Sequence, residues 1–373
     1  QQSQFDALIY FNGSGQFDTT QLKVIGLTLT KASRYVLNMR LGLVSDCILA
    51  NNGVNYSFPF MFEKTVIRNS KIENNKGQAI FFFQGDWGNP QYTTVENCLF
   101  LNNYSFWQNL SSGNQEPVGI NGNGGAVIYL NNSTKLNLTN NIFYKNNGEN
   151  LINISSGGQR DTINIVNNTM FMNKNRAMYN RSWEGDVNNT YFVTRIQNNI
   201  IYNDFVVDNY NSEFWWGAGS NSKPGRMILN NNIIHGGFNP DPKYGYGPLI
   251  EIQFDTASHM DVMPSFSDTA NLKFDLTSTS AGIGAGLSNS FVPNKDIFGV
   301  DRPNPSGSKP ELGAVETSTA LPKPILTSLQ NTVIGGNQRI NIGYSILSNP
   351  KIDSVVIYRS TTSGTSSMTA VNT

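Results

Sequence analysis

The fold is decided by a repeated pattern that stands most plainly in Ile165-Val166-Asn167-Asn168-Thr169-Met170-Phe171-Met172-Asn173. An aliphatic residue lies two places before Asn167, an apolar residue lies three places after it, and a second Asn lies six places after it. We call the position of Asn167 the Asx column, because Asp or Asn recurs there in other copies. Repetition at a short period predicts a solenoid of stacked coils.

Seven copies align on this column, with a weaker copy at Gly26: Asp46, Asn69, Asn97, Asn140, Asn167, Asn198 and Asn231. In these seven copies the residue two before the column is aliphatic and the residue three after it is apolar. Six places after the column stand Asn52, Asn75, Asn103, Asn146, Asn173 and Asp204. A coil of three short strands and three turns needs roughly 20–25 residues, so we expect the more widely spaced copies to carry loops.

These columns predict an all-β fold, a right-handed parallel β-helix. Stacking of coils at the strand spacing of about 4.8 Å places like residues above like, so the aliphatic columns fill the interior. A stacked turn Asn can donate its amide to one neighbouring coil and accept from the other, which forms a ladder. Asn also tolerates the left-handed backbone of a tight turn.

Composition removes several classes of protein. Lys and Arg number 26, as do Asp and Glu, so the chain lacks the basic excess of a nucleic-acid-binding protein. No apolar run is long enough to span a membrane, and two His with two Cys exclude most multi-ligand zinc sites. Asn occurs 52 times, but 22 Phe, 15 Tyr and 5 Trp argue against an Asn-rich disordered chain. Cys47 and Cys98 share a column two coils apart, too far for a disulfide, so we expect two buried free thiols.

A second region, residues 272–316, carries the motifs Asp296-Ile297-Phe298-Gly299-Val300-Asp301-Arg302-Pro303 and Glu311-Leu312-Gly313-Ala314-Val315-Glu316. These motifs resemble the C-terminal end of bacterial choice-of-anchor Q β-helix proteins, which belong to the pectate-lyase-like superfamily. Gly282 stands where that family usually has Pro. The resemblance implies a secreted or cell-surface protein, of a type frequent in Bacteroidota, and predicts fold better than chemistry.

The same reading divides the chain into three parts. Residues 1–271 are expected to form the β-helix with Asn ladders, and residues 272–320 its C-terminal end and cap. Residues 321–373 are expected to begin an immunoglobulin- or fibronectin-like sandwich that this sequence does not complete. Similar proteins can carry a type IX secretion signal further on, so secretion or surface-anchoring machinery is a possible partner.

Binding residues are expected in the loops, because inserts in a solenoid usually build its binding face. Aromatic rings beside carboxylates suit sugars, since the ring covers the C–H face and the acid accepts from hydroxyls. The candidates for binding polysaccharide are Trp87, Trp107, Trp183, Trp215, Trp216, Tyr144 and Tyr202. Two alternatives stay open: the Trp rings seal the loops, and Tyr144, Phe171, Tyr202 and His235 form a ladder that only stiffens a sheet.

Catalysis by a glycoside hydrolase needs paired carboxylates, whereas a polysaccharide lyase uses a Lys or Arg base, often with Ca²⁺. The candidate acids are Asp86, Glu184, Asp186 and Glu213. No compact catalytic motif groups them, so an enzyme remains uncertain and no cofactor is implied beyond Ca²⁺ for a lyase. The sequence therefore predicts a polysaccharide-binding β-helix protein, with a lyase or hydrolase, and a non-catalytic adhesin or stalk, as the alternatives.

Overall fold

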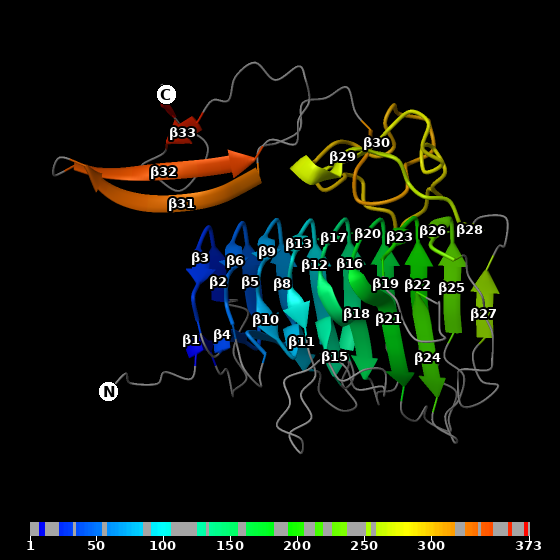
Figure 1. Cartoon of the computed structure of the whole chain (residues 1–373), viewed down its shortest axis with the longest axis horizontal. Coiled ribbons are helices and arrows are strands. Elements are labelled where there is room, and N and C mark those ends of the chain that lie inside the picture. The colour runs from blue at the N-terminus through cyan, green and yellow to red at the C-terminus, as the bar shows by residue number, and fades with distance from the viewer. Residues whose placement is uncertain are drawn as a thin grey trace.

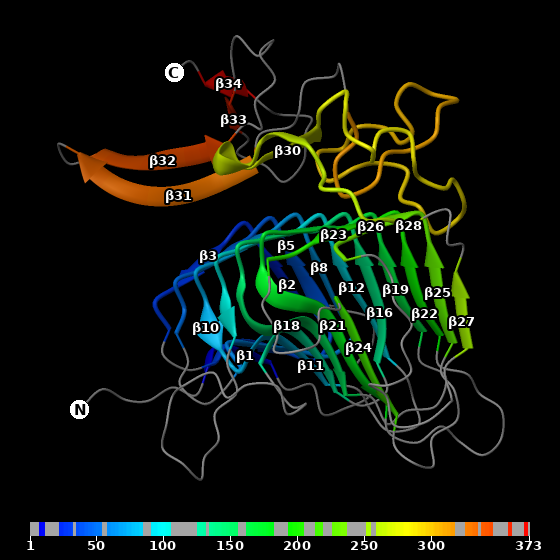
Figure 2. The same ribbon diagram turned by 45° about the vertical axis from the view of Figure 1, so that its right-hand side comes forward.

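The computed structural model describes the following parts of the chain: residues 7–11, 22–32, 35–53, 58–84, 91–105, 125–131, 134–155, 162–182, 193–204, 213–218, 226–236, 251–254, 259–317, 325–334, 337–345, 357–359 and 369–371. Three parallel sheets stack their strands coil upon coil, as Figures 1 and 2 show. Successive strands of the chain belong to these three sheets in turn, which are called A, B and C below, and this order confirms the predicted parallel β-helix.

Each coil contributes strands to the three sheets in the same order. Sheet A holds β1 (Ala7–Phe11), β4 (Tyr35–Met39), β7 (Phe60–Phe62), β10 (Lys76–Gly77), β11 (Ala79–Gln84), β14 (Tyr104–Ser105), β15 (Ala126–Asn131), β18 (Asn147–Ser155), β21 (Lys174–Ser182) and β24 (Phe214–Ala218). Sheet B holds β2 (Leu22–Ile25), β5 (Gly42–Ser45), β8 (Thr65–Arg68), β12 (Gln91–Glu96), β16 (Thr134–Thr139), β19 (Thr162–Val166), β22 (Val193–Gln197), β25 (Arg226–Asn230) and β27 (Glu251–Phe254). Sheet C holds β3 (Thr28–Thr30), β6 (Ile48–Ala50), β9 (Lys71–Glu73), β13 (Leu99–Leu101), β17 (Ile142–Tyr144), β20 (Thr169–Phe171), β23 (Ile200–Tyr202), β26 (Asn232–Ile234) and β28 (His259–Met260).

The two apolar columns form the core of the solenoid, as predicted. The residues two before the Asx column are all buried: Val44, Ile67, Val95, Leu138, Ile165, Ile196 and Leu229. The residues three after it are buried as well: Leu49, Ile72, Phe100, Phe143, Met170, Ile201 and Ile234. Burial of whole aliphatic columns supplies most of the driving force for such a fold, at about 25 cal/mol per Å² of apolar surface.

One predicted ladder runs through the turns between sheets C and A. The backbone N and Nδ2 of Asn75 both donate to Oδ1 of Asn103 at 3.0 Å, and Asn103 donates in the same way to Asn146. The next rungs are Asn173 and then Asn203, whose Oδ1 accepts from Asn173 Nδ2 at 2.7 Å. The assignment of Asp204 to this column was therefore wrong by one residue, because this coil lacks the left-handed residue that precedes the rung elsewhere, such as Met172.

A second ladder, which the pattern did not predict, lies one residue after the Asx column in the turns between sheets B and C. It joins Asn141, Asn168, Asn199 and Asn232, each N and Nδ2 donating to the next Oδ1 at 2.8–3.1 Å. The Asx column itself supplies the left-handed turn, with φ of 49–56° at its seven Asp and Asn residues. In each turn, the left-handed backbone is thus adopted by the Asx residue, and the ladder hydrogen bonds are made by the residue that follows it.

The two cysteines replace Asn in this second ladder and are free and buried, as predicted. Cys98 Sγ lies 3.8 Å from Ile67 O and 3.3 Å from Glu96 O. Asn141 Nδ2 makes the equivalent contacts one coil later, with Val95 O at 2.9 Å and Thr139 O at 3.0 Å. The thiol thus occupies the position of the ladder amide.

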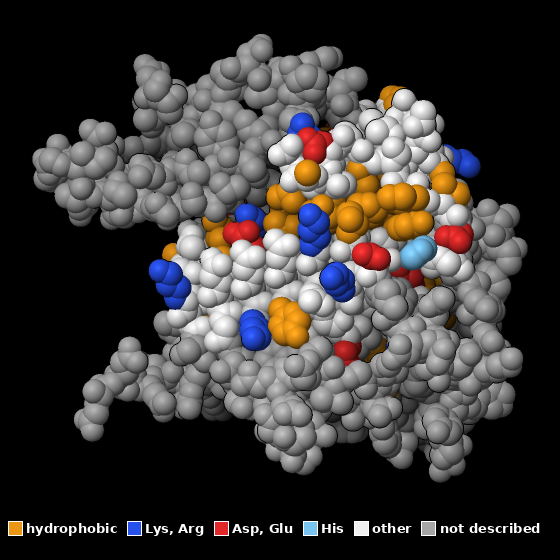
Figure 3. All heavy atoms as spheres, viewed as in Figure 1, with side chains coloured by type: hydrophobic (Ala, Val, Ile, Leu, Met, Phe, Trp, Pro, Cys, Tyr) orange, Lys and Arg blue, Asp and Glu red, His pale blue; other side chains and the backbone are white. Residues whose placement is uncertain are grey.

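After sheet C ends, residues 265–316 fold back along the solenoid; we call them the flank segment. It begins with the antiparallel pair β29 (Phe266–Asp268) and β30 (Lys273–Leu276), joined by the 3-10 helix η3 (Thr269–Asn271). Its Phe266, Phe274 and Phe298 pack on outward side chains of sheet C, and hydrophobic side chains gather in a band there (Figure 3). The region predicted to be an end cap therefore covers the side of the solenoid.

Side-chain amides of the Asx column hold this segment in place. Asn140 Nδ2 donates to Lys295 O at 2.7 Å, Asn198 Nδ2 to Leu287 O at 2.9 Å, and Asn231 Nδ2 to Ala285 O at 2.8 Å. The outward-pointing Asn side chains of the Asx column thus form a row of hydrogen-bond donors to which the flank segment binds.

Beyond the flank segment, the described strands form two antiparallel pairs. One pairs β31 (Ile325–Ile334) with β32 (Asn337–Ser345), and the other pairs β33 (Ile357–Arg359) with β34 (Thr369–Val371). The start of an immunoglobulin-like sandwich stays a prediction. No helix among the described residues has the length and apolar character needed to cross a membrane.

Candidate functional site: a polar groove beside the flank segment

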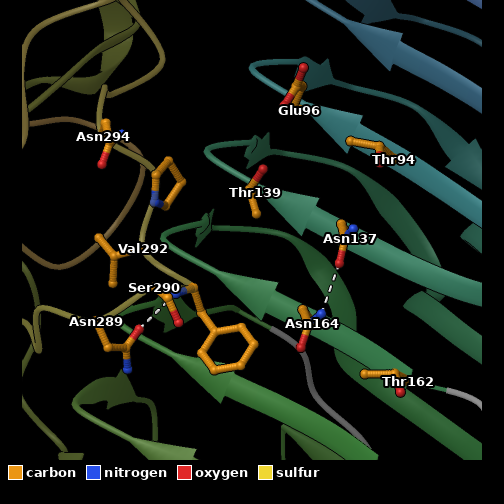
Figure 4. A pocket seen from close by; sticks show the side chains of 12 residues that line it. Thr94, Glu96, Asn137, Thr139, Thr162, Asn164, Asn289, Ser290, Val292 and Asn294 are labelled. Carbon is orange, nitrogen blue, oxygen red and sulfur yellow. Dashed lines mark hydrogen bonds between the residues drawn. The ribbon is translucent and has the colours of Figure 1, made fainter.

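A groove of about 850 Å³ lies between the outer face of sheet B and residues 289–294 of the flank segment. Figure 4 shows its two sides, with strands of three successive coils on one side and the segment on the other. The volume lies within the range of 300–1,000 Å³ that is usual for ligand sites.

The floor of the groove is made of polar side chains that point outward because alternate residues of a strand face opposite sides. Thr94, Asn137 and Asn164 stand in register on adjacent coils. Asn164 Nδ2 donates to Asn137 Oδ1 at 2.8 Å, which fixes the orientation of both amides (Figure 4). The floor thus offers a row of hydroxyl and amide groups that repeats along the solenoid axis.

The wall of the groove is tied to the solenoid at two points. Asn289 and Gln197 exchange two side-chain hydrogen bonds, of 3.0 and 3.2 Å. Asn140 holds the other end through its bond to Lys295 O. Residues 290–294 lie between these anchors, so the wall has a fixed position relative to the floor.

An aromatic ring and a cation stand together at the rim. Phe291 lines the groove and is 42% exposed. The Arg195 guanidinium lies 3.5 Å from the centre of its ring, and Arg195 Nη1 donates to Asn164 Oδ1 at 3.2 Å. Stacking on an aromatic ring and a hydrogen bond together hold the guanidinium and the ring in one orientation.

Glu213 is the predicted acid that the structure describes, and it is buried. Its Oε1 accepts from Asn203 N at 2.9 Å, and its Oε2 accepts from Asn203 Nδ2 at 2.9 Å and from Ala177 N at 3.2 Å. Burial raises the pKa of the Glu213 carboxyl to about 7, against the lowering effect of these hydrogen bonds. With 1% of its surface exposed, Glu213 cannot contact a polymer and acts instead as the last acceptor of the ladder.

The predicted aromatic residues of sheet C are covered. Tyr144 is 5% exposed, its ring in edge-to-face contact with Phe274 at 5.2 Å between centres. Tyr202 stacks on His235 at 4.4 Å and packs beneath the flank segment. These rings face outward as the alternation predicts, but the flank segment occupies the space where a sugar would bind.

The remaining candidates lie either in β24 or outside the described residues. Asp86, Trp87, Trp107, Trp183, Glu184 and Asp186 lie outside the described residues. Trp215 and Trp216 belong to β24, and Trp215 is in register with Tyr179 of β21. On earlier coils of sheet A, the residues in register with Tyr179 are Asn153, Tyr129 and Phe82. By backbone register, Trp215 thus follows a row of sheet A positions that holds Phe82, Tyr129 and Tyr179.

The groove itself was missed by sequence reasoning. Its floor could have been found, because Thr94, Asn137 and Asn164 all lie three places before the Asx column, as does Arg195 at the rim. Its wall could not, since the course of the flank segment follows from contacts distant in sequence. Among the described residues, no group of three or more His, Cys, Asp or Glu side chains could hold a metal ion.

Comparison with known proteins found no match: no family model, curated protein or solved structure matches the chain.

Proposed function

We propose that this protein is a secreted or cell-surface β-helix protein that binds polysaccharide. The observation that carries the proposal is the groove, where hydroxyls and fixed amides repeat from coil to coil beside the exposed ring of Phe291. A polymer of sugar units presents hydroxyls at a regular repeat and an apolar C–H face, and these match a polar row and an aromatic ring.

A binding protein is a better match to the described residues than an enzyme. Glycoside hydrolysis needs two carboxyl groups about 5–9 Å apart, whereas Glu96 is the one carboxylate among the described residues lining the groove. A hydrolase or lyase remains the second candidate, because the predicted acids Asp86, Glu184 and Asp186 lie outside the described residues.

The Trp-bearing side of the solenoid is a second candidate surface for the same function. The register of Trp215 with Tyr179 favours it, since the column that they continue also includes Tyr129 and Phe82. The secreted or surface location, and a role for type IX secretion machinery, rest on the sequence resemblance of residues 272–316 alone. The third candidate function is that of an adhesin or stalk that binds no glycan.

A glycan-array screen tests the proposal, with reducing-end and ultraviolet assays for unsaturated products on each hit. Binding without product supports a recognition protein, and binding with product makes it a hydrolase or lyase. Binding to no glycan would remove both and leave the adhesin or stalk.

Two matched variants then identify the surface. Phe291→Ala should weaken binding by about three- to tenfold, because an aromatic contact contributes about 0.5–1.5 kcal/mol. Leu287→Ala is the control, since Leu287 is similarly exposed, at 40%, on the same segment but is not among the groove's lining residues. Equal effects of the two variants would place the site elsewhere, and Trp215→Ala would then be the variant to test.

A further inference from the structure

The charges around the groove allow the class of polysaccharide to be narrowed. Eight of its twelve described lining residues are Thr, Ser or Asn, and Phe291, Val292 and Pro293 lie on the wall. The charged member is Glu96, at the end of β12. Within the described parts of the chain, no ion pair engages its carboxylate.

Three cations on neighbouring strands, Arg68, Arg195 and Lys135, each have contacts of their own. Arg68 is in register with Glu96 one coil earlier, but its Nε donates to Ser45 Oγ on the far side, at 3.4 Å. Arg195 is committed to Phe291 and Asn164. Lys135 is in register with Tyr92 of the preceding coil and has a contact of its own. None of these three residues is part of the described lining.

We infer that the groove selects uncharged, hydroxyl-rich glycans and excludes anionic ones, with Glu96 as the residue that determines this selectivity. A carboxylate on the ligand would meet one like charge and no cation among the described lining residues, since the Arg195 guanidinium lies at the rim, stacked on Phe291. Burying such a charge without a partner costs free energy, and repulsion from Glu96 adds to that cost. Hydroxyls, by contrast, can both donate to and accept from the amides of the floor. This inference rests on the proposed function of the groove.

Matched polymers test it with the whole chain. A glucan and a galactomannan are each compared with the same polymer after oxidation of its primary alcohols to carboxylates. The native protein should bind each oxidised form roughly fivefold or more weakly than its neutral parent, the scale of a single partly exposed charge contact. Raising the salt concentration should reduce this difference, because salt screens such charges.

Glu96→Gln removes the charge and keeps the shape. The variant should recover binding to the oxidised polymers and keep its affinity for the neutral ones within about twofold. Asp204→Asn is the control, since Asp204 is exposed after β23 and its removal changes net charge equally without touching the groove. Asp204→Asn should leave both affinities unchanged.

Three results would overturn the inference, and they can be told apart. Oxidised polymers that bind the native protein as well as their parents would show that the groove accepts anions. Recovery by Asp204→Asn as well as by Glu96→Gln would show an effect of net charge alone. Binding of neither polymer class, with no hit on the array, would instead remove the proposed function itself.

Discussion

The Glu213 carboxylate receives both amide hydrogens that Asn203 directs along the ladder, with N···O distances of 2.9 Å to each oxygen. In every earlier rung from Asn52 to Asn146, one Oδ1 of the next Asn accepts both bonds. The next coil has Gly236 and Gly237 near the equivalent position, so no Asn can follow Asn203. Glu213, which directly precedes β24, thus provides a terminal acceptor that the turn sequence lacks.

Replacing Glu213 by Ala should destabilise the protein by about 3–5 kcal/mol. Three buried N–H groups, of Asn203 and Ala177, would lose their acceptor, and each buried unsatisfied group costs about 1–3 kcal/mol. Glu213→Gln keeps one oxygen acceptor and should cost less, about 1–2 kcal/mol. Urea unfolding followed by circular dichroism measures both. Equal losses for Ala and Gln would contradict a role as terminal acceptor, and Asp204→Asn is the exposed control.

Stability should fall as the pH rises from about 4.5 to 7. Burial raises the pKa of Glu213 and of Glu149 to about 7, whereas an unfolded Glu titrates near 4.3. Between these values the native state binds more protons than the unfolded state, so unfolding becomes easier with increasing pH. The Tm should therefore be higher at pH 5 than at pH 8.

Glu213→Gln should remove part of this pH dependence. The groups that interact electrostatically with Glu213 include Arg176 and His235, and Glu149 interacts with Arg176, so Glu149 still contributes in the variant. Burial also raises the pKa of Glu311 to about 9, together with its hydrogen bond to Glu316, which extends the decline above pH 7. A Tm profile identical to that of the native protein would show that Glu213 is ionised throughout.

The solenoid was predictable because each coil repeats the same environment. Val95 and Phe100 could be placed in the core from their columns alone, since stacking forces like residues together. The register of Asn203 was not predictable, because the omission of one turn residue cannot be seen from an Asn-Asp pair. The burial of Tyr144 was missed for another reason: the strand pattern shows only that the ring leaves the solenoid, and the covering Phe274 comes from 130 residues later in the chain.

Cys98→Asn should stabilise the protein by about 1 kcal/mol. The Sγ of Cys98 already lies against the two carbonyls that a ladder amide contacts, and Cys98 N already donates to Asn141 Oδ1 at 3.0 Å. An Asn at this position would replace weak thiol contacts by amide hydrogen bonds, each with a net contribution of about 0.5–1.5 kcal/mol. The thermal midpoint should rise. Cys98→Ala, which removes the thiol without adding an amide, is the control and should lower it.

The motifs that carry the family resemblance form a buried ionic network inside the flank segment. Arg302 Nη1 lies 3.2 Å from Glu316 Oε2 and also donates to the carbonyl oxygens of Glu311 and Gly313. Glu316 N donates to Asp296 Oδ2 at 3.0 Å. The same two carbonyl oxygens accept from Asn167 Nδ2 of the solenoid, at 3.3 and 3.2 Å. The same carbonyl groups therefore stabilise the flank segment internally, through Arg302, and bind it to the solenoid, through Asn167.

Replacing Arg302 by Met should release the flank segment while the solenoid stays folded. Removing one partner of a buried ion pair leaves the other charge unpaired, at a cost of about 3–5 kcal/mol. Hydrogen exchange should then increase across residues 265–316 and in the sheet C strands that they cover, whereas the buried strands of sheet A keep their protection. Lys295→Met is the control, because Lys295 pairs with Asp301 at the surface, where a pair contributes about 0–1 kcal/mol. Loss of protection throughout the solenoid would show instead that the segment is needed for the β-helix itself to fold.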